Sequence, residues 1–118
     1  MATPATFNIA YYRGDTYSFS IRPKDQDGNP VNLTSEWTAY FTIADERGPD
    51  YTFTVPGTVD IEDGEVLNCS IPSDVGLTLD GDTVYVYDVE VRNTTPTPPV
   101  VQTYLTGTVT VTEDVSNA

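Results

Sequence analysis

Apolar and polar residues alternate along most of this chain. In residues 17–21, 37–44 and 85–92, aromatic, β-branched or other apolar residues recur at every second position. Successive side chains of a β-strand point to opposite faces, so each segment offers one apolar face to a core. We therefore predict strands in these segments. The longest, residues 83–92, is expected near the centre of a sheet.

Short turn sequences separate the predicted strands. Each combines Gly with Asp, Asn, Arg or Pro, residues that suit tight reversals of the chain. The turns lie at residues 13–15, 27–30, 47–50, 56–57, 63–64 and 80–82. The remaining strands are expected at residues 7–12, 51–55, 58–62, 65–71, 100–105 and 108–112.

Two segments do not continue the alternation. We expect a short helical turn near residues 73–79 that crosses between two sheets and places Leu77 and Leu79 in the core. Residues 93–99 contain three prolines, which cannot donate hydrogen bonds to a strand ladder. An exposed loop is expected there.

This arrangement predicts an all-β fold. Seven to nine short strands separated by turns are typical of an immunoglobulin-like, two-sheet antiparallel β-sandwich. The length of 118 residues fits a single domain over residues 1–118. Its core is expected at about residues 6–112, with a flexible N-terminal arm and a flexible C-terminal tail.

The charge of the chain restricts its partners. The chain has 18 acidic and 5 basic residues, a net charge of −13. Such a surface repels phosphate backbones and anionic lipids, so we expect neither nucleic-acid binding nor membrane binding. The N-terminal sequence lacks the basic segment and apolar run of a secretory signal, which predicts synthesis in the cytoplasm.

The residue types that usually carry catalysis are scarce. The chain has no histidine, which removes the usual general base and the commonest metal ligand. No Gly-rich phosphate loop follows a strand into a helix. The single cysteine, Cys69, lies in a predicted strand and is expected to be buried and inert. We therefore predict a protein that is not an enzyme and has no cofactor.

Calcium binding is an alternative at residues 25–36. Asp25, Asp27 and Glu36 partly follow the spacing of an EF-hand loop. However, Pro30 stands at the sixth position, where that loop requires glycine for its sharp turn. A solvated hairpin turn is the preferred interpretation, and no metal site is predicted.

Candidate partner contacts come from outward-facing tyrosines, from arginines and from the proline-rich loop. Tyrosine is common in protein interfaces because it offers a large contact area at a small loss of conformational entropy. Trp37, by contrast, begins an alternating strand and is expected between the sheets. The candidates are Tyr12, Arg13, Tyr40, Arg47, Thr95, Pro96, Pro98 and Tyr104. Residues 1–8 and 113–118 are further candidates, as arms that become ordered on a partner.

Several motifs resemble those of a known family. They are RGDTYSF at residues 13–19, KDQDGNPVNLT at 24–34, WTA at 37–39, GDTVYVYDVEV at 81–91 and LTGTVTVTEDV at 105–115. In order and spacing they resemble small structural domains of bacteriophage particles, in particular the immunoglobulin-like N-terminal domain of baseplate upper proteins and its stand-alone relatives. The resemblance extends from about residue 8 to 115. The family often carries a receptor-binding or coiled-coil extension, which this sequence lacks. That difference favours attachment to the particle over a host-receptor role.

The resemblance implies a virion structural protein. It would dock on the particle exterior, with a capsid decoration or cement protein slightly favoured over a tail or baseplate adaptor. The expected partners are major capsid, tail or baseplate proteins, met as a homo-oligomer or a symmetric multi-copy array. A carbohydrate-binding or adhesion module is the alternative of another class.

Overall fold

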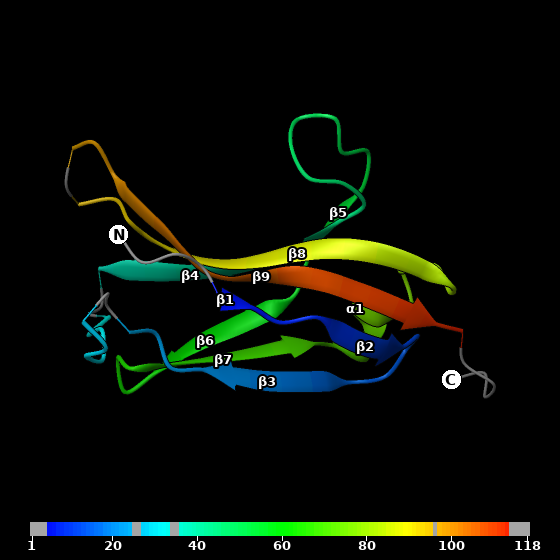
Figure 1. Cartoon of the computed structure of the whole chain (residues 1–118), viewed down its shortest axis with the longest axis horizontal. Coiled ribbons are helices and arrows are strands. Elements are labelled where there is room, and N and C mark those ends of the chain that lie inside the picture. The colour runs from blue at the N-terminus through cyan, green and yellow to red at the C-terminus, as the bar shows by residue number, and fades with distance from the viewer. Residues whose placement is uncertain (1–4, 25–26, 34–35, 96, 114–118) are drawn as a thin grey trace.

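Two β-sheets lie face to face in the computed structural model of the chain (Figure 1). The structure describes residues 5–24, 27–33, 36–95 and 97–113. Its strands are β1 (Ala5–Thr6), β2 (Ile9–Tyr12), β3 (Tyr17–Ile21), β4 (Trp37–Ala44), β5 (Thr54–Pro56), β6 (Thr58–Glu62), β7 (Val66–Ile71), β8 (Thr83–Asn93) and β9 (Val100–Thr112), with the short helix α1 (Ser73–Gly76) before β8. The larger sheet has the order β1–β9–β8–β4–β5, with β2 also on β9, and the smaller has the order β3–β7–β6. The all-β, two-sheet prediction is confirmed.

Most predicted strands occur where the alternation placed them. Strands β4 and β6 have the predicted bounds, and β8 lies between β4 and β9 in the larger sheet. The predicted strand at 51–55 is shifted to Thr54–Pro56. The strands predicted at 100–105 and 108–112 form the single strand β9. Gly107 does not interrupt this strand, because it is buried and pairs with Tyr87 of β8.

The sheets are not entirely antiparallel, which corrects the prediction. Strands β1 and β2 pair with β9 in parallel, with Ala5 opposite Leu105 and Ile9 opposite Val109. The chain passes from β2 to β3 in the other sheet, so no hairpin imposes an antiparallel neighbour on β2. Residues 5–8, part of the segment 1–8 that was predicted to become ordered on a partner, therefore lie along β9 within the domain itself. Residues 1–4 and 114–118 of the predicted arm and tail lie outside the described residues.

The core fills the space between the two sheets. Phe41 of β4 and Tyr87 of β8 are each 2% exposed, and their ring centroids lie 5.6 Å apart. Phe19 of β3 contacts both rings from the opposite sheet, at 5.6 Å and 6.4 Å. Trp37 is half-buried and packs against this core, and Cys69 is buried, as predicted. Aromatic residues thus compensate for the modest apolar content of the chain.

The segment after α1 corrects one core prediction. Leu79 is fully buried, whereas Leu77 is 38% exposed. The Leu77 side chain lies beside Gly14 in the β2–β3 turn, where an added Cβ would be 3.1 Å from its Cδ2 atom. Leu77 therefore covers that turn at the surface instead of entering the space between the sheets.

Candidate functional site

The outer face of the larger sheet carries polar side chains from its two central strands. We define this outer face as Thr38, Tyr40 and Thr42 of β4 together with Asp88, Glu90 and Arg92 of β8. These residues alternate with core residues, and the register pairs them one to one. Cross-strand neighbours on one face of a sheet lie close enough to interact.

An ordered aromatic–ionic cluster occupies one end of the outer face. The Arg92 guanidinium carbon lies 4.8 Å from the centroid of the Tyr40 ring. The Nε and Nη2 atoms of Arg92 each lie 2.6 Å from Oε1 of Glu90. Tyr40 is 41% exposed, as the sequence predicted, and these contacts restrict its orientation.

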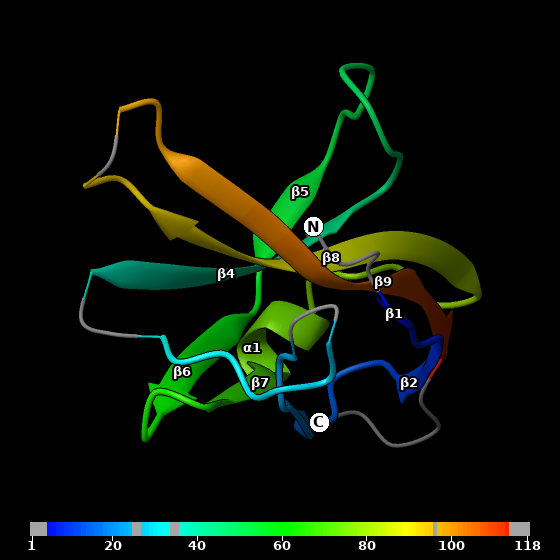
Figure 2. The same ribbon diagram turned by 60° about the vertical axis from the view of Figure 1, so that its left-hand side comes forward.

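A loop borders the other end of the outer face and projects from it (Figures 1 and 2). This loop, residues 45–53 between β4 and β5, is shaped by Asp45. The Asp45 carboxylate accepts hydrogen bonds from the Thr52 hydroxyl at 2.6 Å and from the backbone N–H groups of Thr52 and Phe53 at 3.1 and 3.2 Å. The Thr52 hydroxyl bond, together with these backbone bonds, lowers the pKa of Asp45. The Phe53 ring lies 5.8 Å from that of Tyr85 and ties the loop to the core.

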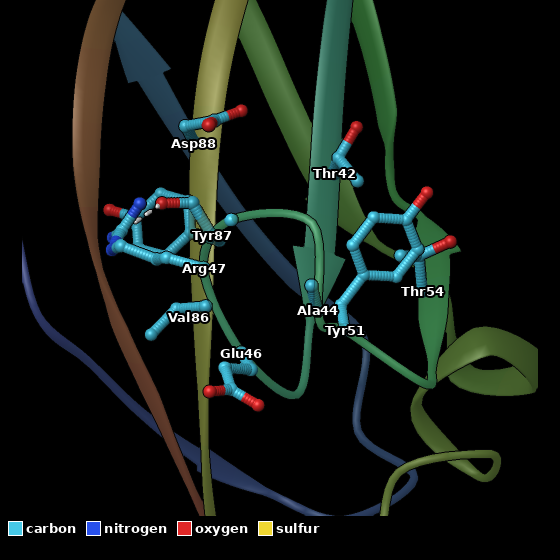
Figure 3. A pocket seen from close by; sticks show the side chains of 10 residues that line it. Thr42, Ala44, Glu46, Arg47, Tyr51, Thr54, Val86, Tyr87 and Asp88 are labelled. Atoms are coloured by element: carbon cyan, nitrogen blue, oxygen red, sulfur yellow. Dashed lines mark hydrogen bonds between the residues drawn. The ribbon is translucent and has the colours of Figure 1, made fainter.

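Arg47 anchors the same loop to the sheet. Its Nη2 atom donates to the backbone carbonyls of Tyr87, at 3.2 Å, and Gly107, at 3.0 Å. Figure 3 shows the guanidinium directed toward β9, with Tyr51 and Thr54 on the opposite side of the site. Arg47 was predicted as a partner contact, but these bonds give it a structural role in holding the loop.

The loop and the outer face together line an open pocket of about 410 Å³ (Figure 3). Side chains of β4, β5, β8 and the loop contribute to its wall. They are Thr42, Ala44, Glu46, Arg47, Gly48, Tyr51, Thr54, Val86, Tyr87 and Asp88. The Tyr51 ring is 52% exposed at the rim. The pocket thus combines carboxylates, hydroxyls and one accessible aromatic ring.

Asp88 is the electrostatically unusual residue of this pocket. Burial disfavours its charged form and, with the nearby charge of Glu90, raises the pKa of its carboxyl despite Arg47 and Arg92. Within the described part of the chain, Asp88 accepts no hydrogen bond and forms no ion pair through its side chain. A partly desolvated carboxylate without a direct partner is a feature of functional sites.

Because its folded-state pKa is raised, Asp88 destabilises the fold as pH rises through its unfolded and folded pKa values. Below both values the carboxyl is protonated in both states and the penalty is absent. We therefore expect Asp88→Asn to raise Tm by roughly 1–3 °C at pH 7 and to give no gain at about pH 3. Thermal unfolding followed by circular dichroism tests this, with Asp60→Asn on the exposed face of β6 as the control. A lower Tm for Asp88→Asn at pH 7 would mean that Asp88 supports the fold.

The end of the β8–β9 hairpin forms a second exposed feature. We define the hairpin arm as residues 92–95 and 97–101. Its tip extends past the end of β4 and past the smaller sheet (Figures 1 and 2), whereas Arg92 and Asn93 still pair with Thr38 and Trp37 of β4. Val100 and Val101 of the arm are each 43% exposed. Consecutive strand residues point to opposite faces, so neither apolar face of the arm is fully covered.

The predicted contact residues do not form one surface. Tyr40 and Arg47 lie along the outer face, whereas Thr95 and Pro98 are exposed on the hairpin arm. Tyr12, 59% exposed, lies at the end of β2. Pro96 lies outside the described residues.

Besides Arg47, two of the predicted contact residues have structural roles. Arg13 donates from Nε to the Leu79 carbonyl at 2.9 Å and from Nη2 to the Leu77 carbonyl at 2.8 Å. Tyr104 was expected to point outward, but it packs against the core. The register shifts at this point, because Val89 pairs with Leu105 and Glu90 with Thr103. Tyr104 is therefore the extra residue of a β-bulge, which changes the direction of its side chain.

The sequence analysis missed Asp88, Tyr51, Val100 and Val101. A usable signal existed for Asp88, because it is a charged residue in the middle of the strand predicted to be central. No comparable signal marked the other three, since their exposure depends on how the 45–53 loop and the hairpin arm are placed in the fold.

Two expectations from the sequence concern metal ions and membranes. Asp25 of the calcium alternative lies outside these residues, and within them no group of three or more acidic or cysteine side chains is arranged to hold a metal ion. None of their helices is long and apolar enough to cross a membrane. A scan against protein-family models finds no matching family, and a search of curated proteins finds no similar sequence.

Proposed function

We propose that this protein is a non-enzymatic structural component of a bacteriophage particle. It docks on the particle exterior as a capsid decoration or cement protein, and a tail or baseplate adaptor is the alternative placement. The main observation in support of docking is that Val100 and Val101 of the hairpin arm are exposed on both of its faces. We place the protein in a phage particle because its sequence motifs resemble those of bacteriophage structural domains.

The hairpin arm has the properties of a docking element. Val100 and Val101 present apolar area on β9, opposite Asn93 and Arg92 of β8, where the smaller sheet does not reach (Figure 2). Burying such area against a partner is favourable by about 25 cal/mol for each Å². Exposed apolar groups surrounded by polar residues are a recognised mark of protein interfaces. Thr95 and Pro98 of the arm are exposed as well.

The strong negative charge supports an exterior position. A net charge of −13 repels packaged DNA and is compatible with a surface that faces solvent. A small arm gives a weak contact for one copy. Many copies on a symmetric lattice multiply that contact, so a single domain of this size can be retained on a particle.

The double variant Val100→Asp, Val101→Asp tests this function. We expect at least about a tenfold loss of particle occupancy, since charges would replace the buried apolar centre of the contact. The measurement is quantitative mass spectrometry of purified phage particles from the strain that carries the gene. The controls are the single variant Val84→Asp, on an exposed valine at the other end of β8, and the single variant Val101→Asp, which adds the same one charge on the arm.

Two results would contradict the proposal. One is the absence of the wild-type protein from purified particles while it is present in the particle-free lysate. The other is full occupancy by the hairpin-arm variant when circular dichroism shows that it is folded. Loss of occupancy by the Val84 control alone would place the contact at the opposite end of the sheet.

A further inference from the structure

The pocket between the 45–53 loop and the outer face holds more negative charge than its own residues neutralise. Glu46 and Asp88 line it, and Glu90 lies next along the same face of β8. Arg47 is the only basic residue of the pocket wall. Its Nη2 atom is engaged by two backbone carbonyls, and no ion pair joins it to Asp88 in the part of the chain described here.

This charge pattern favours an external cation. A carboxylate that is partly removed from water is stabilised when an opposite charge comes within about 4–6 Å. The attraction exceeds that of a fully exposed pair, since the Asp88 carboxyl is partly buried and the local dielectric is lower there. Arg92 supplies only part of this charge, because it is also paired with Glu90 and stacked on the Tyr40 ring, and the pKa of Asp88 stays raised despite Arg47 and Arg92. Asp88 thus has acceptor capacity that the domain leaves unused.

The shape and chemistry of the pocket narrow the class of cation. Tyr51 places an accessible ring at the rim, and aromatic rings attract ammonium and guanidinium groups within about 6 Å. The hydroxyls of Thr42 and Thr54 are further acceptors for N–H donors. A volume of about 410 Å³ accommodates a long, flexible side chain. A hard metal ion would require more oxygen ligands than the two carboxylates supply.

We propose that this pocket receives the charged end of a lysine or arginine side chain from the protein on which the domain docks. The inference rests on the proposed docking function and names the chemistry of the partner at a second contact. Asp88 supplies the principal charge, Tyr51 the cation–π contact and Thr42 a hydrogen-bond acceptor. The hairpin arm contributes apolar contact, and the pocket contributes specificity for a basic surface.

The groups around Asp88 determine how cation binding in the pocket depends on pH. From the loop, Glu46 and Arg47 face the pocket. From β8, Glu90 and Arg92 act on the same carboxyl. Strands β4 and β5 contribute the uncharged Thr42 and Thr54. Binding of a cation is therefore strongest above the raised pKa of Asp88 and weakens as pH falls through it.

A nuclear magnetic resonance titration of the 15N-labelled full chain tests the inference. The probes are N-acetyl-lysine-methylamide and N-acetyl-arginine-methylamide, and N-acetyl-norleucine-methylamide is the uncharged control of similar length. We expect saturable amide shifts within residues 42–54 and 86–88 for the charged probes only. Asp88→Asn is expected to weaken binding about tenfold and Tyr51→Ala about threefold. Asp60→Asn on the exposed face of β6 is the matched control and leaves binding unchanged.

Three outcomes would overturn the inference. Equal shifts with norleucine would mean apolar binding only. Shifts outside the pocket would mean that the cation binds elsewhere. Shifts at the pocket with N-acetylglucosamine but not with lysine or arginine would make a neutral sugar the ligand.

Particle occupancy separates this inference from the proposed function. If Asp88→Asn keeps full occupancy while the hairpin-arm variant loses it, the docking function stands and the pocket contact is wrong. If the wild-type protein is absent from particles, the docking function is wrong whatever the pocket binds.

Discussion

Replacing Phe41 with alanine lowers the free energy of unfolding by about 3–5 kcal/mol. Phe41 is 2% exposed and lies between the two sheets, with its ring against Phe19 and Tyr87. Gly57 also approaches it closely, since a Cβ added there would be 2.4 Å from Cδ2 of Phe41. Removing the ring leaves a cavity that the two sheets cannot close without breaking their pairing. A domain of this size has a total stability of about 5–15 kcal/mol, so the variant loses much of it.

Urea unfolding followed by tryptophan fluorescence measures this loss. Thr38→Ala is the matched control, because Thr38 lies on the same strand with its side chain exposed on the outer face. We expect its effect to stay within about 0.5 kcal/mol. Phe41→Leu keeps most of the volume and is expected to lose less than Phe41→Ala. A loss below about 1 kcal/mol for Phe41→Ala would contradict the position of this ring at the centre of the core.

The sequence predicts the position of Phe41 because local alternation determines it. In residues 37–44 every second residue is apolar, and a shift by one residue would turn all of them toward solvent. The same reasoning predicted β3 and β6 completely and β7 and β8 to within one residue. In these strands the period of two, together with a turn at each end, is a sufficient signal. The two-sheet fold follows, because each such strand must bury one face.

Features that depend on distant segments were not predictable in this way. The parallel pairing of β1 and β2 with β9 joins the two ends of the chain, and no local pattern specifies it. The bulge at Tyr104 depends on the register between β8 and β9. Leu77 is exposed because α1 ends before it and the β2–β3 turn lies beneath its side chain. Each correction comes from a tertiary contact that overrides the local periodicity.

The candidate site illustrates the same distinction. Alternation alone places Asp88 and Thr42 on the outward face, and their pairing follows from the register of β4 and β8. The pocket exists only because Asp45 shapes the loop and Arg47 reaches carbonyls of β8 and β9. Arg47 and Gly107 are separated by 60 residues in sequence. Side chains with outward direction were therefore predictable, whereas the enclosure that gives Asp88 its raised pKa was not.

A substitution at Gly107 tests the close approach of the N-terminal segment to β9, which the sequence did not predict. An added Cβ at Gly107 would lie 2.2 Å from the backbone oxygen of Phe7. That oxygen also accepts the hydroxyl hydrogen bond of Tyr87. Backbone atoms cannot move aside as a flexible side chain does. We therefore expect Gly107→Ala to lower the free energy of unfolding by about 2–3 kcal/mol and to displace the first strands from β9.

Hydrogen exchange distinguishes this displacement from general destabilisation. The N–H of Phe7 donates to the Thr106 carbonyl at 3.0 Å, and the N–H of Thr108 to the Asn8 side chain at 3.2 Å. In Gly107→Ala both amides are expected to lose protection before those of β4 and β8. Thr110→Ala, at an exposed position of β9, is the matched control. We expect the amides of Phe7 and Thr108 to remain protected in this variant. Unchanged stability with unchanged protection at Phe7 would contradict the close approach of the two backbones. A uniform loss of protection in both sheets would mean that the first strands and the core unfold as one unit.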